Sequence, residues 1–308
     1  MVPEPVIETL PPRLWDHFAK EGTDAFRIAH SSGAWIERLG TDLLLNYQTE
    51  TLLEPLLAWC ASLPSAVGFV PERIFGRFLP VRNQERVSPV LLAGDPASPL
   101  QAVVSEAGVR YGLDFSAGYS TGLFLDQRGN RARVRRHAKG RFLNTFSYTC
   151  SFSVCAALAG AETLSVDLSR KSLSRGEANF ALNGLPLEGH RFFAADVREV
   201  FPRLARRGER FETIILDPPT FSTSHAKGRF RVEDDLGELV QAALEVSAPQ
   251  ARILVSTNCT RLGLRDLERI CRGALKLHRL SGSIQHCPPL EDFPPGTGAS
   301  CVWLQLGG

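Results

Sequence analysis

Asp167, Asp196 and Asp217 each stand at or just after the end of an apolar run in this 308-residue chain. If the runs are parallel strands, their carboxyl ends meet at one edge of a sheet, where open α/β folds bind nucleosides. Asp167 can then accept hydrogen bonds from both ribose hydroxyls. Asp196 can accept one from an exocyclic amine such as that of adenine, with Val197 packed on the ring. The competing role for Asp167 and Asp196 is to cap the helix that follows.

Asp217 precedes two prolines, Pro218 and Pro219, which fix φ twice and remove two backbone donors. The result is a rigid rim with free carbonyl groups, suited to holding a flat polar ring on which Phe221 could stack. The segment 222–230 contains serine, histidine, lysine and glycine, and we expect it to be mobile enough to close over a substrate. The alternative is a plain rigid turn.

Cys259 follows the apolar run 251–258 and is expected at the same edge of the sheet. A thiolate there could add to C6 of a pyrimidine and make C5 nucleophilic. The alternative is that Cys259 only fills space at the end of a strand. None of the seven histidines has a partner at metal-ligand spacing, so the sequence predicts no metal site.

A basic stretch without any acidic residue runs from Arg128 to Arg141, although the net charge of the whole chain is only +2. Such a stretch is typical of a surface that contacts nucleic-acid phosphates. If it is a β-strand, alternate arginines share one face; otherwise it is a solvated face of an arginine-rich protein. The arginines expected to contact phosphates are Arg131, Arg133, Arg135 and Arg136.

The elements that must position these residues alternate from residue 141 onwards. Alternation of strands with helices predicts a Rossmann-like, doubly wound and mainly parallel sheet, and two final strands predict an antiparallel edge. Strands are expected near 141–146, 162–167, 190–195, 212–217, 251–258, 280–286 and 299–306. Helices are expected near 152–160, 170–183, 197–207, 235–248 and 265–277.

The N-terminal region predicts a small α+β domain over residues 1–105, with no motif that can be assigned to chemistry. Between residues 102 and 134 the apolar period becomes two, which predicts a β-ribbon that includes a strand over 121–128. We therefore expect a second domain, 106–308, that contains this ribbon and the doubly wound sheet.

Composition places the chain among ordinary soluble globular proteins, because 44% of its residues are hydrophobic and 22% are charged. No apolar run reaches the roughly 18 residues of a membrane span, and the N-terminus lacks the pattern of a signal peptide. A cytoplasmic location without membrane contact is therefore expected. The seven cysteines form no C-x-x-C pair, which argues against a disulfide framework or a zinc site.

At these residues the chain resembles the class I S-adenosylmethionine-dependent methyltransferases. Within that class it is similar to the large-subunit ribosomal RNA methyltransferases of the RlmI and RlmK type, and closer to the RlmK type. The resemblance covers residues 110–306. It rests on the segments 121–128 (TGLFLDQR), 144–149 (NTFSYT), 166–169 (VDLS), 179–185 (NFALNGL) and 216–222 (LDPPTFS).

The resemblance implies that S-adenosyl-L-methionine is the cofactor and that RNA, in particular large-subunit ribosomal RNA, is the partner. The cofactor's methionine part would lie along Phe146, Ser147, Tyr148 and Thr149. Its ribose would be bound by Asp167 with Leu168, and its adenine by Asp196 and Val197. The methyl-transfer side would be lined by Asp217, Pro218 and Pro219, with Gln127 and Arg128 reaching the cofactor or the target.

The chain departs from the family pattern directly after Thr149. The family usually has glycine or another small residue after Ser-Tyr-Thr, where this chain has Cys150 and Ser151. A missing glycine removes easy access to positive φ. We expect cofactor binding to survive provided that the turn needs no residue in the left-handed conformation.

Two target atoms are compatible with the sequence. The DPPTFS segment, with Asn258 followed by Arg261, is similar to RlmK-type enzymes, which methylate guanine N7; that nitrogen has a lone pair and needs no covalent catalyst. Cys259 is similar to the cysteine of RlmI-type enzymes, which methylate cytosine C5 through a covalent adduct. Guanine N7 is the first hypothesis. A small-molecule or protein substrate, and a non-catalytic RNA-binding factor on the same fold, are the alternatives.

Overall fold

The computed structural model describes residues 6–79, 87–224 and 228–307. The chain divides into two compact units, the first made of Met1–Leu125 with Glu291–Pro295 and the second of Asp126–Leu290 with Gly296–Gly308. The unit boundary thus lies after residue 125, whereas the sequence placed a domain boundary after residue 105. The difference arises because the β7–β8 hairpin (Gln101–Glu106 and Val109–Asp114) is hydrogen-bonded to Thr23 and Asp24 of the first unit.

The first unit is built on a six-stranded sheet in the order β1-β2-β3-β4-β5-β6, antiparallel except for the β4–β5 pair. Its apolar cluster includes Trp15, Phe26 and Leu56, which join the helices to the sheet. The strands are β1 (Glu8–Thr9), β2 (Ala25–Ser31), β3 (Ala34–Leu39), β4 (Asp42–Tyr47), β5 (Arg73–Phe78) and β6 (Val90–Ala93). The helices are α1 (Pro12–Lys20), η1 (Glu50–Leu52) and α2 (Leu53–Val67).

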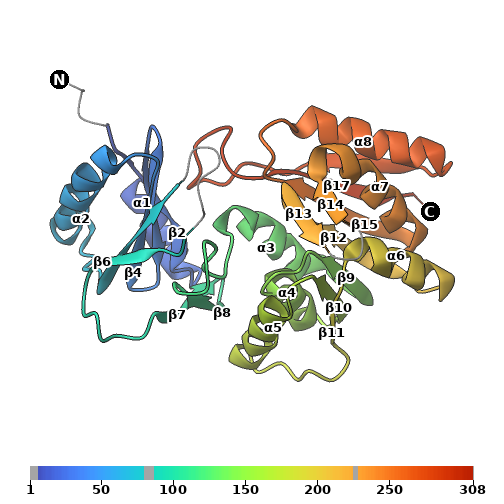
Figure 1. The fold of residues 1–308 in the computed structure, drawn as a ribbon, viewed down its shortest axis with the longest axis horizontal. Helices are drawn as coiled ribbons and strands as arrows, with labels where there is room; N and C mark the ends of the chain where they lie inside the picture. The colour runs from blue at the N-terminus through green and yellow to red at the C-terminus, as the bar shows by residue number, and fades with distance from the viewer. Residues whose placement is uncertain (1–5, 80–86, 225–227, 308) are drawn as a thin grey trace. The chain divides into compact units, whose positions relative to one another are not determined.

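The second unit contains the predicted doubly wound sheet, in the order β11-β10-β9-β12-β15-β17-β16 (Figure 1). The first five strands are parallel, and β17 and β16 form the predicted antiparallel edge. The Rossmann-like fold class is therefore confirmed. The strands are β9 (Arg141–Thr145), β10 (Glu162–Asp167), β11 (Arg191–Ala194), β12 (Phe211–Leu216), β15 (Ser247–Thr257), β16 (Gly282–His286) and β17 (Ser300–Leu306).

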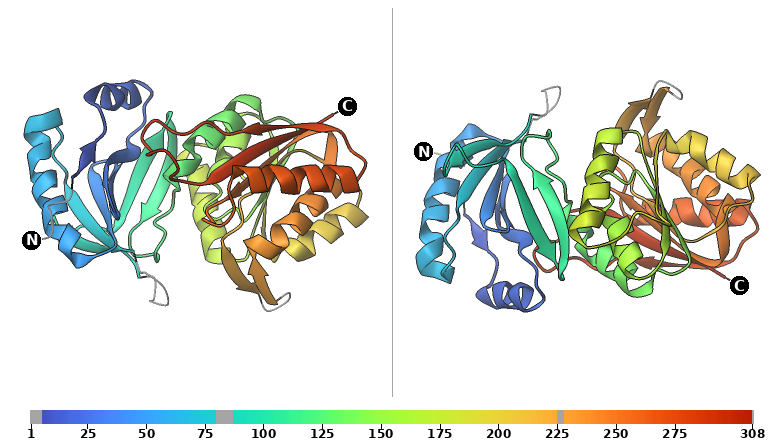
Figure 2. Two further views of the ribbon diagram at one scale, coloured as in Figure 1. Left: turned by 90° about the horizontal axis from the view of Figure 1, so that it is seen from above. Right: turned by 90° about the horizontal axis from the view of Figure 1, so that it is seen from below.

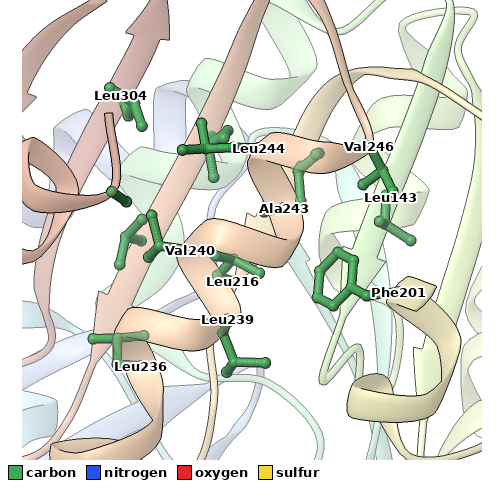
Figure 3. Packing of buried hydrophobic residues seen from close by; sticks show 14 of the residues in the cluster. Leu143, Phe201, Leu216, Leu236, Leu239, Val240, Ala243, Leu244, Val246 and Leu304 are labelled. Carbon is green, nitrogen blue, oxygen red and sulfur yellow. The ribbon is translucent and has the colours of Figure 1, made fainter. Parts of the chain in front are cut away.

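Two helical layers cover this sheet (Figure 2). Helix α4 contacts both α3 and α5, and helix α7 contacts both α6 and α8. Beneath the second group, Phe201, Leu216 and Val240 meet in the main apolar cluster of the unit (Figure 3). The helices are α3 (Arg128–His137), α4 (Ser151–Leu158), α5 (Arg170–Leu182), α6 (Val197–Arg206), α7 (Val232–Glu245) and α8 (Leu264–Leu277).

The strand register decides which residues can form a site. Thr145 of β9 pairs with Val166 of β10 on one side and with Leu216 of β12 on the other, and Leu216 also pairs with Val255 of β15. The residues that follow these four emerge together at one edge of the sheet. Strand order reverses between β9 and β12, which is the switch point where open α/β sheets bind ligands.

The prediction of a strand over 121–128 and of an arginine-bearing strand after it was wrong. A 3-10 turn, η2 (Leu125–Gln127), leads into helix α3, which holds the basic stretch. The buried positions of α3 are Asn130, Arg131 and Val134, spaced one and then three residues apart, as on one side of a helix. Alternate arginines therefore do not share a face.

Among residues 6–79, 87–224 and 228–307, no helix has the length and apolar character that a bilayer crossing requires. Within the same ranges, no group of three or more histidine, cysteine or acidic side chains is arranged to hold a metal ion.

Candidate functional site

The turn after β9 has an unusual backbone. Phe146, Tyr148 and Cys150 have φ values of 53°, 47° and 59°, although none of them is glycine. The amide of Ser147 donates to the carbonyl of Val166 (3.0 Å), and the amide of Cys150 donates to the carbonyl of Ser147 (2.7 Å). Left-handed residues other than glycine cost about 1–3 kcal/mol each and persist where the surroundings fix them, often at ligand-binding sites.

Cys150 shows that the turn does need a left-handed residue where the family usually has glycine. The condition under which we expected Cys150 to be harmless is therefore not met. The chain accommodates the extra side chain through Gly176 of α5. A Cβ at Gly176 would lie 2.4 Å from Sγ and 2.8 Å from Cβ of Cys150, so only glycine leaves room for the thiol.

Asp167 holds this turn to the end of β10. Its Oδ2 accepts from the amide of Tyr148 (2.8 Å) and its Oδ1 accepts from the amide of Ser169 (2.8 Å). Burial raises the pKa of Asp167, and the two amides limit the rise. A carboxylate has about four acceptor positions, so capacity remains for two hydroxyl donors. Ser169, not Asp167, caps α5 by accepting from the amide of Ser172. Leu168 is exposed beside Asp167.

Asp196 has the capping role that the sequence left open. Its Oδ1 accepts from the backbone amide and Nε of Arg198, and its Oδ2 accepts from Nη2 of Arg198 and from Ser224 Oγ. Burial by itself would raise the pKa of Asp196, but the bonds from Arg198 and Ser224 bring it below its ordinary value. All four acceptor positions are thus in use, and an adenine amine could bind only by replacing one donor. Val197 is buried.

Asp217 extends from β12 into a buried polar network. Gln127 Nε2 lies 3.4 Å from its Oδ1 and donates to Ser256 Oγ at 2.7 Å. Burial is the main cause that raises the pKa of Asp217 to about 6; Ser256 opposes the rise and Asp126 adds to it. Of the two prolines that follow, Pro218 is buried and Pro219 is exposed.

Gln127 was expected to reach the cofactor or the target, but it lies only 1% exposed behind Asp217. Its Oε1 accepts from Asn130 Nδ2 (2.8 Å), and Asn130 Oδ1 accepts from Trp303 Nε1 (2.9 Å). Asn130, Ser256 and Trp303 were not among the residues predicted from the sequence. Asn130 lies one turn after Gln127 in α3, but the incorrect strand assignment hid that spacing. Arg128 begins α3 and is partly buried.

Cys259 lies at the carboxyl end of β15 but is buried in the main apolar cluster. Its Sγ donates to Glu233 Oε1 at 3.2 Å, and the other oxygen of Glu233 pairs with Arg261. The thiol is thus held by α7 and has 5% of its surface exposed.

The expected phosphate-binding arginines have different surroundings. Arg131 is 1% exposed, so it is removed from the surface that could contact RNA. Arg133 lies over the ring of Trp303, 4.9 Å from its centroid, and is partly buried. Arg135 is exposed while donating to the carbonyl of Leu158, and Arg136 is exposed. Phe221 is 54% exposed on the strand that follows the prolines.

A methyltransferase identity follows from comparison with known proteins. The profile of the family described as S-adenosylmethionine-dependent methyltransferase matches residues 69–305. The chain belongs to this family, its cofactor is S-adenosylmethionine, and the family resemblance noted in the sequence is confirmed. Asp167, with two amides bound and acceptor positions to spare, fits the ribose of that cofactor.

Named relatives point in the same direction. The chain is 35% identical over 234 residues to ribosomal RNA large subunit methyltransferase K of Neisseria meningitidis, covering 73% of this chain and 65% of the relative. It is 34% identical over 272 residues to ribosomal RNA large subunit methyltransferase K/L of a Shewanella species, covering 82% and 36%. The chain thus spans less than two thirds of either relative's length.

The fold also has solved counterparts. SMU.776, described as a methyltransferase and solved in complex with SAH, superposes with a TM-score of 0.81 at 24% sequence identity. The match covers 95% of this chain and 78% of that one. At this identity the likeness concerns the fold alone.

The contact between Cys150 and Gly176 predicts an effect opposite in sign to the usual one. Alanine normally stabilises a helix over glycine by roughly 0.5–1 kcal/mol, but Gly176→Ala is expected to lower the free energy of unfolding by about 1–3 kcal/mol because it overpacks the thiol. In a Cys150→Gly background the same change should stabilise. Chemical denaturation of the four proteins gives the coupling energy.

Gly273→Ala is the matched control, since Gly273 also lies within a helix and a Cβ there would meet no atom within 4 Å. It should stabilise in both backgrounds. Equal effects of Gly176→Ala with and without the thiol would contradict the proposed compensation.

The raised pKa of Asp217 predicts a pH-dependent stability. The folded-state value of about 6 exceeds the ordinary 3.8, so the folded protein holds this proton more tightly than the unfolded chain. The corresponding stability is complete below about pH 4 and is lost as pH rises through about 6, on the order of 3 kcal/mol in total. Asp217→Asn should remove this loss, so that the variant gains stability relative to wild type between pH 4.5 and 7.5.

Denaturant midpoints at several pH values provide the measurement, with the exposed Asp234→Asn as control. Parallel pH profiles for wild type and Asp217→Asn would show that the carboxyl group is not perturbed.

Proposed function

We propose that this chain methylates a base of large-subunit ribosomal RNA, with guanine N7 as the target atom. S-adenosylmethionine supplies a methyl group on a positively charged sulfur when it is bound. The relatives that support an RNA substrate are named as ribosomal RNA large subunit methyltransferases. A ribosomal RNA substrate also agrees with the cytoplasmic location expected from the sequence.

Residues that follow different strands would bind different parts of the cofactor. Asp167 would accept the ribose hydroxyls, and the turn of Phe146, Ser147, Tyr148 and Thr149 would hold the methionine part through its strained backbone. This arrangement supports cofactor binding without a glycine in the turn, because the hydrogen bonds from Ser147, Tyr148 and Cys150 already fix the left-handed residues.

The target base would lie at Asp217 and the rim formed by Pro218 and Pro219. Guanine carries an exocyclic amine, which can donate a hydrogen bond to a carboxylate or to a free carbonyl group. Gln127 and Ser256 hold the Asp217 side chain from behind, so its orientation is set before a base arrives. Positioning the nitrogen lone pair is all that transfer to N7 requires of the protein.

The surroundings of Cys259 are the observation that favours guanine N7 over cytosine C5 as the target atom. A cysteine that adds to C6 needs a free path to the base, and an exposed, electropositive setting favours its thiolate. The Cys259 thiol instead donates to the Glu233 carboxylate and lies in the apolar cluster. Methyl transfer to guanine N7 needs no such nucleophile.

Mass-spectrometric mapping of ribosomal RNA tests this function. RNA from cells without the protein should lack one methyl group at N7 of a guanine in the large subunit. The wild-type gene should restore it, and a gene carrying Asp217→Ala should not. An unchanged methylation map, together with no S-adenosylmethionine binding by calorimetry, would favour a non-catalytic RNA-binding factor instead.

Cys259→Ala separates the two target atoms. Methylation by this variant should stay within about tenfold of wild type, because no contact with reacting atoms is lost. Cys271→Ala is the control, since Cys271 is a buried thiol of the same apolar cluster. Loss of methylation by several orders of magnitude in Cys259→Ala alone, with cofactor affinity intact, would instead establish the cytosine mechanism.

A further inference from the structure

A short hairpin follows the double proline, formed by β13 (Phe221–Ser224) and β14 (Gly228–Arg231). Phe221 pairs with Arg231 and Thr223 pairs with Arg229. Directly paired residues of antiparallel strands point to the same side, so these four side chains share one face of the hairpin. The predicted mobile segment 222–230 coincides with this hairpin, and its residues 225–227 lie outside the described ranges.

The other face of the hairpin is attached to residues of the candidate cofactor site. Ser224 Oγ donates to the carboxylate of Asp196. Phe230 is 1% exposed, and its ring centroid lies 5.8 Å from that of Phe146, the first residue of the strained turn. Arg198 adds bonds from its guanidinium to the carbonyls of Arg229 (3.1 Å) and Gly228 (3.2 Å).

The outer face carries an aromatic ring and two cations. Phe221 is 54% exposed, and Thr223, Arg229 and Arg231 are exposed as well. Within the part of the chain that the structure describes, neither guanidinium group has a carboxylate partner.

The acidic first turn of α7 follows this hairpin directly, but two of its three acids are engaged. Asp235 accepts from the backbone amide of Arg231 (2.6 Å), and Glu233 pairs with Arg261. Asp234 is exposed. Among the described residues, the guanidinium groups of Arg229 and Arg231 thus form no ion pair, and Asp234 is the one acid of this helical turn without a hydrogen bond or ion pair.

We propose that this outer face binds unpaired RNA, with Phe221 stacking on a base and Arg229 and Arg231 contacting the flanking phosphates. An exposed aromatic ring beside cations is the arrangement with which proteins hold single strands, because every base has a face that can stack and every linkage carries a charge. In a duplex the bases are already stacked, so an isolated exposed ring gains little there. The assignment rests on the proposed RNA substrate.

The contacts of the inner face fix the position of this RNA-binding surface relative to the cofactor site. Only Thr220 separates Phe221 from the rim formed by Asp217, Pro218 and Pro219. Because Phe230 and Ser224 fix the hairpin against Phe146 and Asp196, RNA bound on the outer face is held at a set position relative to the cofactor residues. The surface thus positions the strand beside the target base.

Binding of a fluorescently labelled single-stranded ribosomal RNA fragment, measured by anisotropy at several salt concentrations, tests the assignment. Arg229→Ala/Arg231→Ala should reduce the slope of log affinity against log salt by about 1.4, since each lost phosphate contact contributes about 0.7 on a single strand. Phe221→Ala should weaken binding by about 5- to 150-fold and leave the slope unchanged. Calorimetry should give the same S-adenosylmethionine affinity for all variants, which also reports correct folding.

Arg265→Ala/Lys276→Ala is the matched control, because it removes the same charge from exposed positions on α8. The hairpin assignment is overturned, and the RNA substrate stands, if the RNA affinity of the wild type falls steeply with salt but the hairpin double variant loses no more affinity than this control. Duplex RNA bound as tightly as single strands, with no effect of Phe221→Ala, also overturns it. A wild type that binds RNA without salt dependence removes the RNA substrate and the hairpin surface together.

Discussion

The hydrogen bond from the Tyr148 amide to the Asp167 carboxylate is the constraint on which the site depends. It joins the turn after β9 to the end of the neighbouring parallel strand, whose register places both at one edge of the sheet. Three residues of the turn take left-handed conformations that would be unfavourable in a free chain. A buried carboxylate that accepts two amides holds that geometry and still has acceptor positions left for a ligand.

Helix α5 leaves room for the side chain that this turn carries in place of glycine. Cys150 takes a backbone conformation suited to glycine. Its side chain occupies the space that any side chain at position 176 would need, and glycine at that position leaves this space free. Asn179, one turn further along α5, donates to the carbonyl of Thr149 (2.9 Å) and ties the same helix to the turn. Cys150 and Gly176 thus form a packed pair, in which the residue tolerated at one position depends on the other. Cofactor binding at this turn should be judged with both positions in view.

Sequence patterns predicted the doubly wound sheet because apolar runs such as those of β12 and β15 alternate with helical segments, and because α5 and α6 begin at the polar caps Ser169 and Asp196. The same patterns failed at α3, since RGNRARVRRH contains one large apolar residue and two of its three buried positions are polar. Arginine alternation then indicated a strand, although arginine is a good helix former. The distant partners of Asp196 and Asp217 were also beyond prediction. Ser224 lies 28 residues from Asp196 in sequence, and Gln127 lies 90 residues from Asp217, so only the fold brings them together.

In the proposed function, Asp196 links cofactor binding to the position of the β13–β14 hairpin. Its acceptor positions are all taken by Arg198 and Ser224, and both of these residues also hold the hairpin. If an adenine amine binds this carboxylate, it must displace one of those donors, and the hairpin then loses one of its attachments. A coupling of this kind is reciprocal. The factor by which cofactor binding changes the affinity of the hairpin for RNA is also the factor by which bound RNA changes the affinity for the cofactor. The Phe146–Phe230 contact acts differently, because it does not compete with the cofactor for a polar group and can keep the hairpin in place during the exchange.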